Sequence, residues 1–565
     1  MGCPAFIAVM NGLQPFFESY YRLRPVNATF TGVHDHDQRL PDWSPEGRES
    51  ALDGVRALRQ SLGGETMASG DGLKEVRGRD RALALAFLDV QIAEHESGHF
   101  EHSNPSLAAG EAIFSVIALM TRPFGPIGGR LDSAIARLSA IPGFLAGARR
   151  AMIRGIPDEW RLKALRECDG ADRICRDGVV RWRDVEPDEA SWASRTERLL
   201  QAARLAREAF VDFREWLVRD ATAAGPQQHA CGPELFDLLL TRGHFSTCTR
   251  AALRADACAA LDDALARLHE LARAAAPGGW PEVQARLADA HPSTADYLST
   301  YQRIWDACRE RAETARLVTW PAYPIRYVPI PFHTRDAAPF LYYLFYRSPA
   351  PFDALPVHDY VVTPIEPDMP ADEQRRRLRA TNTSVIKLNH VVHHGAIGHH
   401  IQNYYAYHGD SEIGRVAAVD CASRIGMLSA GTMAEGWACY ATDLMEQAGF
   451  LTPDESVAQQ HTRARLLARA VVDIGLHERS LTFDEAVALY RDRVGMSPEA
   501  ARAETCKNSL FPATAVMYWL GTEGLHQLRS QRERAEGTSF SLRRFHDRVL
   551  SYGSIPVPLI ARLMS

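Results

Sequence analysis

Apolar positions recur three or four residues apart through most of the chain, as in residues 196–205, TERLLQAARL. Ala, Leu, Arg and Glu dominate these stretches, and they favour amphipathic helices. The periodic segments are interrupted at four glycine, proline or aspartate clusters, which are typical of turns: Gly63-Gly64, Gly225-Pro226, Pro277-Gly278-Gly279 and Gly409-Asp410. The pattern predicts a mainly α-helical protein whose helices are joined by short turns.

The pattern changes between residues 317 and 364, where Val, Tyr, Phe and Pro replace Ala and Glu. Residues 323–330, 340–346 and 360–363 are rich in β-branched and aromatic side chains, which are typical of short strands. We therefore divide the chain into a helical N-terminal half (1–316), a small β-rich insert (317–364) and a helical half (365–565) that carries the candidate chemistry.

Length and charge narrow the possible partners. At 565 residues and 62.7 kDa the chain exceeds the size of a single core, so we expect at least two subdomains and room for a large cleft. The 64 basic and 70 acidic residues give a formal charge of -6 without long runs of one sign, so no nucleic-acid partner is expected. No segment approaches about 18 uninterrupted apolar residues, so no membrane partner is expected either.

The ten cysteines are scattered, with no Cys-x-x-Cys pair, as is typical of proteins in a reducing compartment. The first residues lack the cationic start and the long apolar core of a secretion signal. We therefore expect a cytoplasmic location.

The most distinctive segment is residues 393–400, HHGAIGHH, which holds four histidines in eight positions. Imidazole is the commonest metal ligand among side chains. A hydrolytic zinc helix has the form His-Glu-x-x-His, in which the glutamate removes a proton from the attacking water. Here His394 occupies the glutamate position and Ile397 occupies that of the second histidine. The segment indicates a metal site without its usual base.

Helical spacing alone leaves the ligand pair open. On a straight helix His390 and His394 lie one turn apart on one face, whereas His393 and His400 share a face about 10 Å apart. Two glycines inside the segment permit an interruption that would change these distances. Each histidine taken singly could be a partly buried polar residue, but the group as a whole favours a metal or proton-transfer role.

Glu435 begins a second constellation, residues 435–440, EGWACY. A downstream glutamate is the third ligand that a two-histidine site needs. The alternative is a capping box, Thr432-x-x-Glu435, in which the glutamate bonds a backbone N–H at the start of a helix. Spacing alone favours the capping interpretation.

Taken together, three motifs resemble the bacterial domain-of-unknown-function family 885. Residues 393–402 are similar to its signature His-Glu-x-x-Pro-Gly-His-His-x-Gln except at the Glu and the Pro. Residues 435–440 match Glu-Gly-Trp-Ala-x-Tyr, and residues 469–477 match Arg-x-x-x-Asp-x-Gly-Leu-His. Residues 27–42 also look like the opening segment of that family.

Members of this family are thought to be metallopeptidase-like hydrolases related to the gluzincins. The resemblance therefore implies a large helical metallopeptidase-like fold with a deep central cleft. It also implies His393, His399 and Glu435 as ligands of a divalent metal, with a turn at Gly398 bringing the second histidine back toward the first. Zinc is the first expectation for the metal, with Fe or Mn as alternatives. A ligand role for Glu435 does not exclude a capping role.

A further family-like stretch, residues 504–521, keeps Pro512, Tyr518 and Gly521 but departs from the pattern at four other positions, which are Lys507, Asn508, Ala513 and Thr514. Tyr518 could donate a hydrogen bond to a developing oxyanion, as a phenol near a metal can. The alternative is a packed core tyrosine.

His477 is another catalytic candidate because it lies in the third motif. Asp473 precedes it by one helical turn and could orient its ring, or the two could form a structural pair. His390, His400 and His408 are secondary candidates.

His394 leaves three outcomes open. It could replace the glutamate as base, it could be an additional ligand in a shell of three histidines and one glutamate, or it could leave a site that binds metal poorly. A nitrogen-rich shell suits Fe, Mn, Ni or Cu as well as Zn, which would open redox or lyase chemistry.

These observations predict a metal-dependent enzyme that acts on a peptide-like or amino-acid-derived small molecule, with hydrolysis of an amide bond as the first interpretation. One alternative is a repurposed, non-hydrolytic metalloenzyme, for instance in small-molecule biosynthesis. The other is a non-catalytic descendant that binds a ligand in the old cleft. The sequence does not fix the oligomeric state.

Overall fold

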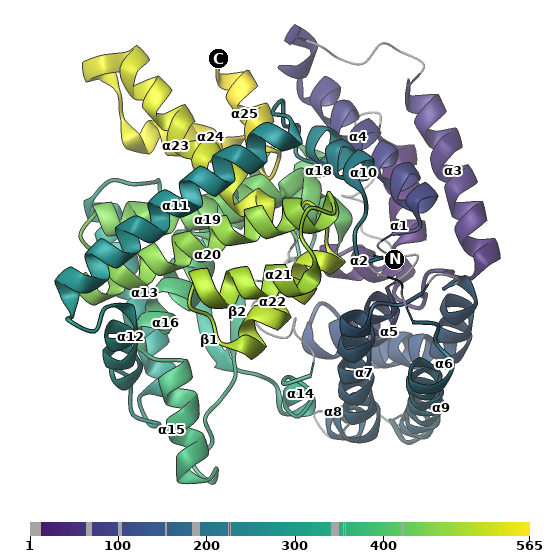
Figure 1. The fold of residues 1–565 in the computed structure, drawn as a ribbon. Coiled ribbons are helices and arrows are strands. Elements are labelled where there is room, and N and C mark those ends of the chain that lie inside the picture. Colours follow the sequence, from purple (N-terminus) through teal and green to yellow (C-terminus); the bar gives the residue numbers. More distant parts are fainter. Residues whose placement is uncertain are drawn as a thin grey trace. The chain divides into compact units, whose positions relative to one another are not determined.

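The computed structural model describes residues 13–63, 70–99, 104–152, 155–183, 192–223, 225, 228–340, 350–353, 355, 357–419 and 423–565. Helices make up 74% of the structure and strands 2%, which confirms the prediction of a mainly helical protein (Figure 1). None of the described helices is long and apolar enough to cross a membrane.

The chain forms two compact units, each built from two separate stretches of sequence. The first unit comprises Met1–His229 and Ile330–Pro356, and the second comprises Ala230–Pro329 and Val357–Ser565. The boundaries between these two compact units do not coincide with those of the three parts expected from composition, near 316 and 364. Residues 330–356 pack with the N-terminal stretch. The three-part division by composition stays a prediction about domain organisation.

The first unit is built from long helices around the buried helix α5. Its elements are α1 (Gln14–Leu23), α2 (Pro25–Thr31), η1 (His34–His36), α3 (Pro45–Gly63), η2 (Gly70–Leu73), α4 (Val76–Ser97), α5 (Pro105–Thr121), α6 (Ile127–Ala151), α7 (Asp158–Arg173), η4 (Ile174–Gly178), α8 (Val179–Arg183), α9 (Trp192–Arg219) and α14 (Phe332–Arg335). Helix α5 packs against α6 and α7, and its side chains are mostly apolar and buried, as expected of a central helix.

His34 ties two distant stretches of the first unit together. Its Nδ1 and Nε2 each lie 2.9 Å from a carboxylate oxygen, of Asp37 and Asp353 respectively. The ring also stacks on Phe124, with the centroids 3.8 Å apart. Burial opposes the charged form, but hydrogen bonds to Asp353 and Asp37 outweigh it and raise the pKa of His34 to about 9.

The second unit contains the remaining helices and both described strands. Its elements are α10 (Pro233–Leu238), η5 (Leu239–Gly243), α11 (Arg250–Ala275), α12 (Trp280–Asp289), α13 (Tyr297–Thr314), β1 (Ile325–Pro329), β2 (His358–Val362), α15 (Ala371–Ala380), α16 (Thr383–Val385), η6 (Ile386–Gly395), α17 (His399–His408), α18 (Glu412–Ala417), η7 (Gly426–Ala430), α19 (Gly431–Gln447), α20 (Pro453–His477), α21 (Phe483–Ala488), η8 (Leu489–Arg493), α22 (Pro498–Leu510), α23 (Val516–Glu536), η9 (Gly537–Ser539), α24 (Leu542–Ser551) and α25 (Val557–Met564).

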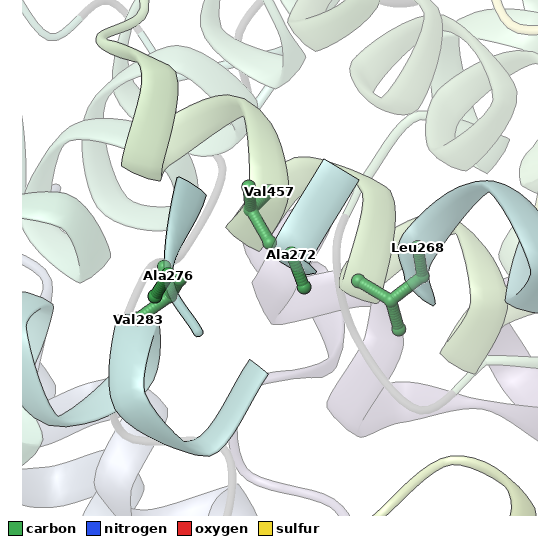
Figure 2. Close-up of a cluster of buried hydrophobic side chains, with 5 residues drawn as sticks. All are labelled: Leu268, Ala272, Ala276, Val283 and Val457. Atoms are coloured by element: carbon green, nitrogen blue, oxygen red, sulfur yellow. The ribbon is translucent and has the colours of Figure 1, made fainter. Parts of the chain in front are cut away.

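Helices α11 and α20 run side by side in the second unit (Figure 1). Small and branched side chains let them approach at one end, where α12 closes the cluster shown in Figure 2, made of Leu268, Ala272, Ala276, Val283 and Val457. Helix α20 starts with a capping box, in which Thr452 and Glu455 satisfy each other's backbone N–H groups. Packing and capping together fix α20, which carries the third sequence motif.

Strands β1 and β2 pair in parallel, with Ile325 opposite His358. Strand β1 lies within the first segment in which a strand was expected, 323–330, and β2 overlaps the third, 360–363. Most of the second segment, residues 341–346, lies outside the described residues.

The doubly paired His34 makes the stability of the first unit depend on pH. Because its pKa is raised on folding, its contribution is fully present below its unfolded pKa of about 6.5 and is lost as the pH rises through about 9. We expect His34→Gln to lower the free energy of unfolding by about 2 kcal/mol at pH 6 and by much less at pH 10. Urea unfolding at both pH values measures this, with His269→Gln, an exposed histidine of α11, as the control. An equal loss at both pH values would contradict the charged pairing of His34.

Candidate metal centre

The histidine segment is not a straight α-helix. Residues Ile386–Gly395 form the π-helical segment η6, and the chain then turns sharply before α17 begins at His399. At Gly398 the backbone has φ -73° and ψ -121°, and a Cβ atom there would overlap the carbonyl oxygen of His393. Only glycine fits this close approach. The turn brings the ring centroid of His399 to 4.9 Å from that of His393.

Two buried tryptophans hold this turn from either side. The indole N–H of Trp305 donates to the carbonyl oxygen of Gly395 at 2.8 Å, and that of Trp437 donates to the carbonyl oxygen of Ile397 at 2.9 Å. Trp437 belongs to the second sequence motif, so that motif supplies both a carboxylate and a support for the histidine turn. Satisfying these buried carbonyl groups fixes the backbone between the histidines.

The side chains of His393 and His399 converge on one oxygen of Glu435. The two Nε2 atoms lie 3.4 and 3.5 Å from Oε2 of Glu435, and the three side chains are between 12 and 21% exposed. These distances are long for hydrogen bonds. Donors at ~2.0–2.2 Å from one tetrahedral zinc ion would lie about 3.3–3.6 Å apart. The distances from Glu435 Oε2 to the two histidine nitrogens therefore fit a single ion.

His394 is the third imidazole of the cluster, since ligand atoms of His393, His394 and His399 all lie within 4.8 Å of one another. Its Nδ1 lies 2.7 Å from the carbonyl oxygen of Asn389, which can only accept, so the hydrogen is on Nδ1. Burial holds the pKa of His394 well below its usual value, and the neighbouring imidazoles act in the same direction. The ring is therefore neutral, and Nε2 carries a lone pair.

The protonation states also suit a cation. Burial opposes ionisation of Glu435, but the charge of His399 and the polar contacts with His393 and His399 hold the pKa of Glu435 well below its usual value. Burial lowers the pKa of His393. An ionised carboxylate beside an imidazole that sheds its proton readily suits metal binding, which needs deprotonated ligands.

The capping interpretation of Glu435 is wrong. Helix α19 begins at Gly431, its N-terminus has no side-chain cap, and Glu435 is its fifth residue. The hydroxyl of Thr432 instead accepts a hydrogen bond from the backbone N–H of Val557 at 3.0 Å. The Glu435 side chain is therefore left to the histidine cluster.

Helix α23 packs closely against α19 just beyond Glu435. A Cβ atom on Gly436 would lie 2.5 Å from the backbone of Gly521, and one on Gly521 would overlap the carbonyl oxygen of Thr432. This glycine contact sets α23 against the helix that carries Glu435. Tyr518 lies one turn before Gly521, at the start of α23.

Arg469 and Glu504 form an ion pair that spacing did not reveal. Arg469 Nε and Nη2 lie 2.7 and 2.9 Å from the two carboxylate oxygens of Glu504, and both side chains are nearly buried. The guanidinium carbon lies 5.1 Å from the ring centroid of Tyr518. The pair joins the third motif, which contains Arg469, to the C-terminal family-like stretch, which contains Glu504. Membership of these two family-like segments was the only sign in the sequence that the two residues matter.

His477 does not join the converging side chains. Its Nε2 donates to the carbonyl oxygen of Asn508 at 3.0 Å, and its Nδ1 accepts from the backbone N–H of Cys231 at 3.2 Å. Both ring nitrogens are thus used in buried contacts. Asp473 accepts from three backbone N–H groups of the turn before α23, those of Ala513, Ala515 and Val516. It builds that turn, and its closest oxygen lies 3.6 Å from His477 Nε2.

The three secondary histidines have other partners, and all three partners come from tyrosine residues: His390 pairs with the Tyr360 hydroxyl, His400 with the Tyr323 carbonyl and His408 with the Tyr404 carbonyl. The pairing of His390 with His394 that a straight helix suggested is not part of the cluster, because η6 is π-helical.

The fold and the site define a class of mainly helical proteins. Its mark is a buried cluster of histidines and one glutamate. The chain belongs to a family of bacterial proteins of unknown function, DUF885, whose model matches residues 25–564. No curated protein matches it.

Two solved structures share the fold. One is from Shewanella oneidensis, with a TM-score of 0.73, 21% identity and coverage of 97% of this chain and 98% of that one. The other is from Colwellia psychrerythraea, with a TM-score of 0.77, 16% identity and coverage of 97% of both chains. Both are provisionally described as lipoproteins, the first of unknown function. At this identity the likeness shows the fold alone, and the cytoplasmic location of this chain stays a prediction.

The contact between α19 and α23 predicts a cost for any side chain at its centre. We expect Gly521→Ala to lower the free energy of unfolding by about 1–3 kcal/mol, because the added methyl must push α23 away from α19. Gly143→Ala is the matched control, since nothing lies within 4 Å of a Cβ atom at this helical position. That change should be neutral or stabilise the protein by up to about 1 kcal/mol. Urea unfolding checks both, and equal effects at the two sites would disprove the close contact.

Proposed function

We propose that this protein is a metal-dependent hydrolase on a metallopeptidase-like scaffold, cleaving an amide bond in a peptide-like or amino-acid-derived small molecule. The observation that carries the proposal is the convergence of His393 and His399 on one oxygen of Glu435. Two imidazoles and one carboxylate are the donor set of many hydrolytic zinc sites, which keep a further position for water or substrate. Zinc is the first choice of metal, and the same donors suit Fe or Mn.

The metal, when bound, would polarise the substrate carbonyl and make water more acidic. His393, His399 and Glu435 would hold it. His394 is the base in this proposal. Its Nδ1–H is anchored on the carbonyl oxygen of Asn389, which leaves Nε2 to take a proton from the attacking water and to pass it to the leaving amine.

Tyr518 supplies a hydrogen bond to the oxyanion that develops on the attacked carbonyl. Its place on the first turn of α23, one turn before the Gly521 contact with α19, supports this role. The structure offers no comparable support for His477, whose two ring nitrogens are engaged elsewhere. The proposal also includes a deep central cleft and a cytoplasmic location. The eight described cysteines are free of disulfides, which is compatible with that location.

One observation favours a second candidate, a non-hydrolytic metalloenzyme. Ligand atoms of His393, His394 and His399 lie within 4.8 Å of one another, so His394 could be a third imidazole ligand. Glu435, which contacts His393 and His399, would add the carboxylate of a shell of three imidazoles and one carboxylate. Such a shell suits redox-active metals and leaves no base at this position.

Metal content tests the donor set. We expect about one equivalent of metal in the wild-type chain and less than about a tenth of an equivalent in His393→Ala, His399→Ala and Glu435→Gln, because each loses a donor of the same ion. Elemental analysis after dialysis measures this, alongside hydrolysis of a dipeptide panel, which should fall at least about 100-fold in the same variants. His408→Gln, on the same helix as His399 but outside the cluster, should retain its metal. A wild-type chain that binds less than a tenth of an equivalent after addition of Zn, Mn or Fe would contradict both candidates.

Substitution of His394 separates the two candidates. If His394 is the base, His394→Gln should lower kcat by about 10²- to 10⁴-fold at full metal content, and His394→Glu should retain hydrolysis. If His394 is a ligand, His394→Gln should release metal instead. Hydrolysis that appears only in His394→Glu would reject the hydrolase and favour the second candidate.

A further inference from the structure

The pair of Arg469 and Glu504 lies in the same part of the second unit as the candidate metal centre. Arg469 projects from α20 and Glu504 from α22, with side chains 12 and 11% exposed. The two hydrogen bonds to Glu504 use Nε and Nη2 of the guanidinium, so Nη1 takes no part in this bidentate pair. The amide of Asn508 bonds the carbonyl oxygen of Arg469 at 3.3 Å, which also fixes the backbone.

Three helices, α20, α23 and α19, connect the guanidinium to Glu435. Its carbon lies 5.1 Å from the ring centroid of Tyr518 on α23. Helix α23 in turn touches α19 through Gly521 and Gly436, next to Glu435. Arg469 is thus linked to the helix that carries Glu435 through Tyr518 and the glycine contact of α23.

Positive charges other than that of Arg469 also act on Glu504. Burial disfavours its ionised form, yet the charges of Arg469, Lys507 and Arg465 lower the pKa of Glu504 to about 2. Three cations thus act on one carboxylate. The charges of Lys507 and Arg465 act on this carboxylate in addition to that of its partner Arg469.

We propose that Arg469, held by Glu504 against the Tyr518 ring, binds a carboxylate of the substrate. A guanidinium matches the geometry of a carboxylate better than any other side chain does, and the edge at Nη1 is the one outside the pair with Glu504. Lys507 and Arg465 add attraction at longer range. This assignment rests on the proposed hydrolase and names its substrate class, which is amides that carry a free carboxylate beside the scissile bond.

The test compares a dipeptide with the same dipeptide converted to its C-terminal carboxamide, on the metal-loaded full chain. We expect the wild-type chain to prefer the free carboxylate about tenfold or more in kcat/KM, since a hydrogen bond to a charged group has this effect. Affinity measured by calorimetry should show the same preference whenever turnover is absent. Equal values for the two dipeptides in the wild-type chain would overturn the proposal without any variant.

The double variant Arg469→Gln/Glu504→Gln removes both charges of the pair, so that neither is left buried alone. We expect its preference for the carboxylate to fall to within about threefold, with metal content unchanged. The matched control is Arg250→Gln/Glu478→Gln. This ion pair is also partly buried, with Arg250 Nε 3.0 Å from Glu478 Oε2, and Glu478 directly follows the end of α20. The control should keep the wild-type preference. If the double variant does not fold, Arg469→Lys replaces it and should reduce the preference at least threefold, because the planar fork is lost.

The outcomes distinguish this inference from the proposed function. Absence of turnover for both dipeptides, with a tenfold preference in affinity that the double variant loses, would reject the hydrolase and keep the carboxylate site. Turnover with no preference, or a preference that survives in the folded double variant, would keep the hydrolase and reject the role of Arg469.

Discussion

The candidate metal centre depends on the tight turn at Gly398. Because the backbone there passes against the carbonyl group of His393, the chain folds back within five residues and His399 faces His393. Trp437 holds this turn and lies two residues after Glu435 on α19, so one helix both supports the histidines and brings the carboxylate to them. A shared cation would bridge Glu435 and the two histidines, whose Nε2 atoms lie 3.4 and 3.5 Å from its Oε2, so we expect metal binding to stabilise this region.

Periodicity predicted the helical class well, because most helices carry their apolar residues at helical spacing. It could not predict the ligand pair, since η6 is π-helical and a break follows it, so distances taken from a straight helix do not apply. Only the family motif indicated His399 in place of His400. Capping of α19 by Glu435 failed as a prediction because the helix starts four residues earlier, at Gly431.

Other features depend on contacts between residues far apart in sequence. The stretch 330–356 joins the first unit through packing that composition does not reveal. Asp473 was considered as a partner for His477, but it binds three backbone N–H groups some forty residues away. Arg469 and Glu504 lie in separate motifs, and their pairing becomes visible only when α20 and α22 lie side by side.

The chemistry of the site is decided at His394, where a glutamate would normally act. A neutral imidazole fixed through Nδ1 can serve as a base or as a ligand, and both roles use the same Nε2 atom. In either role, the central claim is that His393, His399 and Glu435 bind one ion. X-ray absorption spectroscopy of the zinc-loaded chain tests this most directly. We predict one ion with nitrogen and oxygen ligands at about 2.0–2.2 Å and the scattering of at least two imidazoles. A bound ion without imidazole scattering, or a spectrum unchanged in His393→Ala, would contradict it.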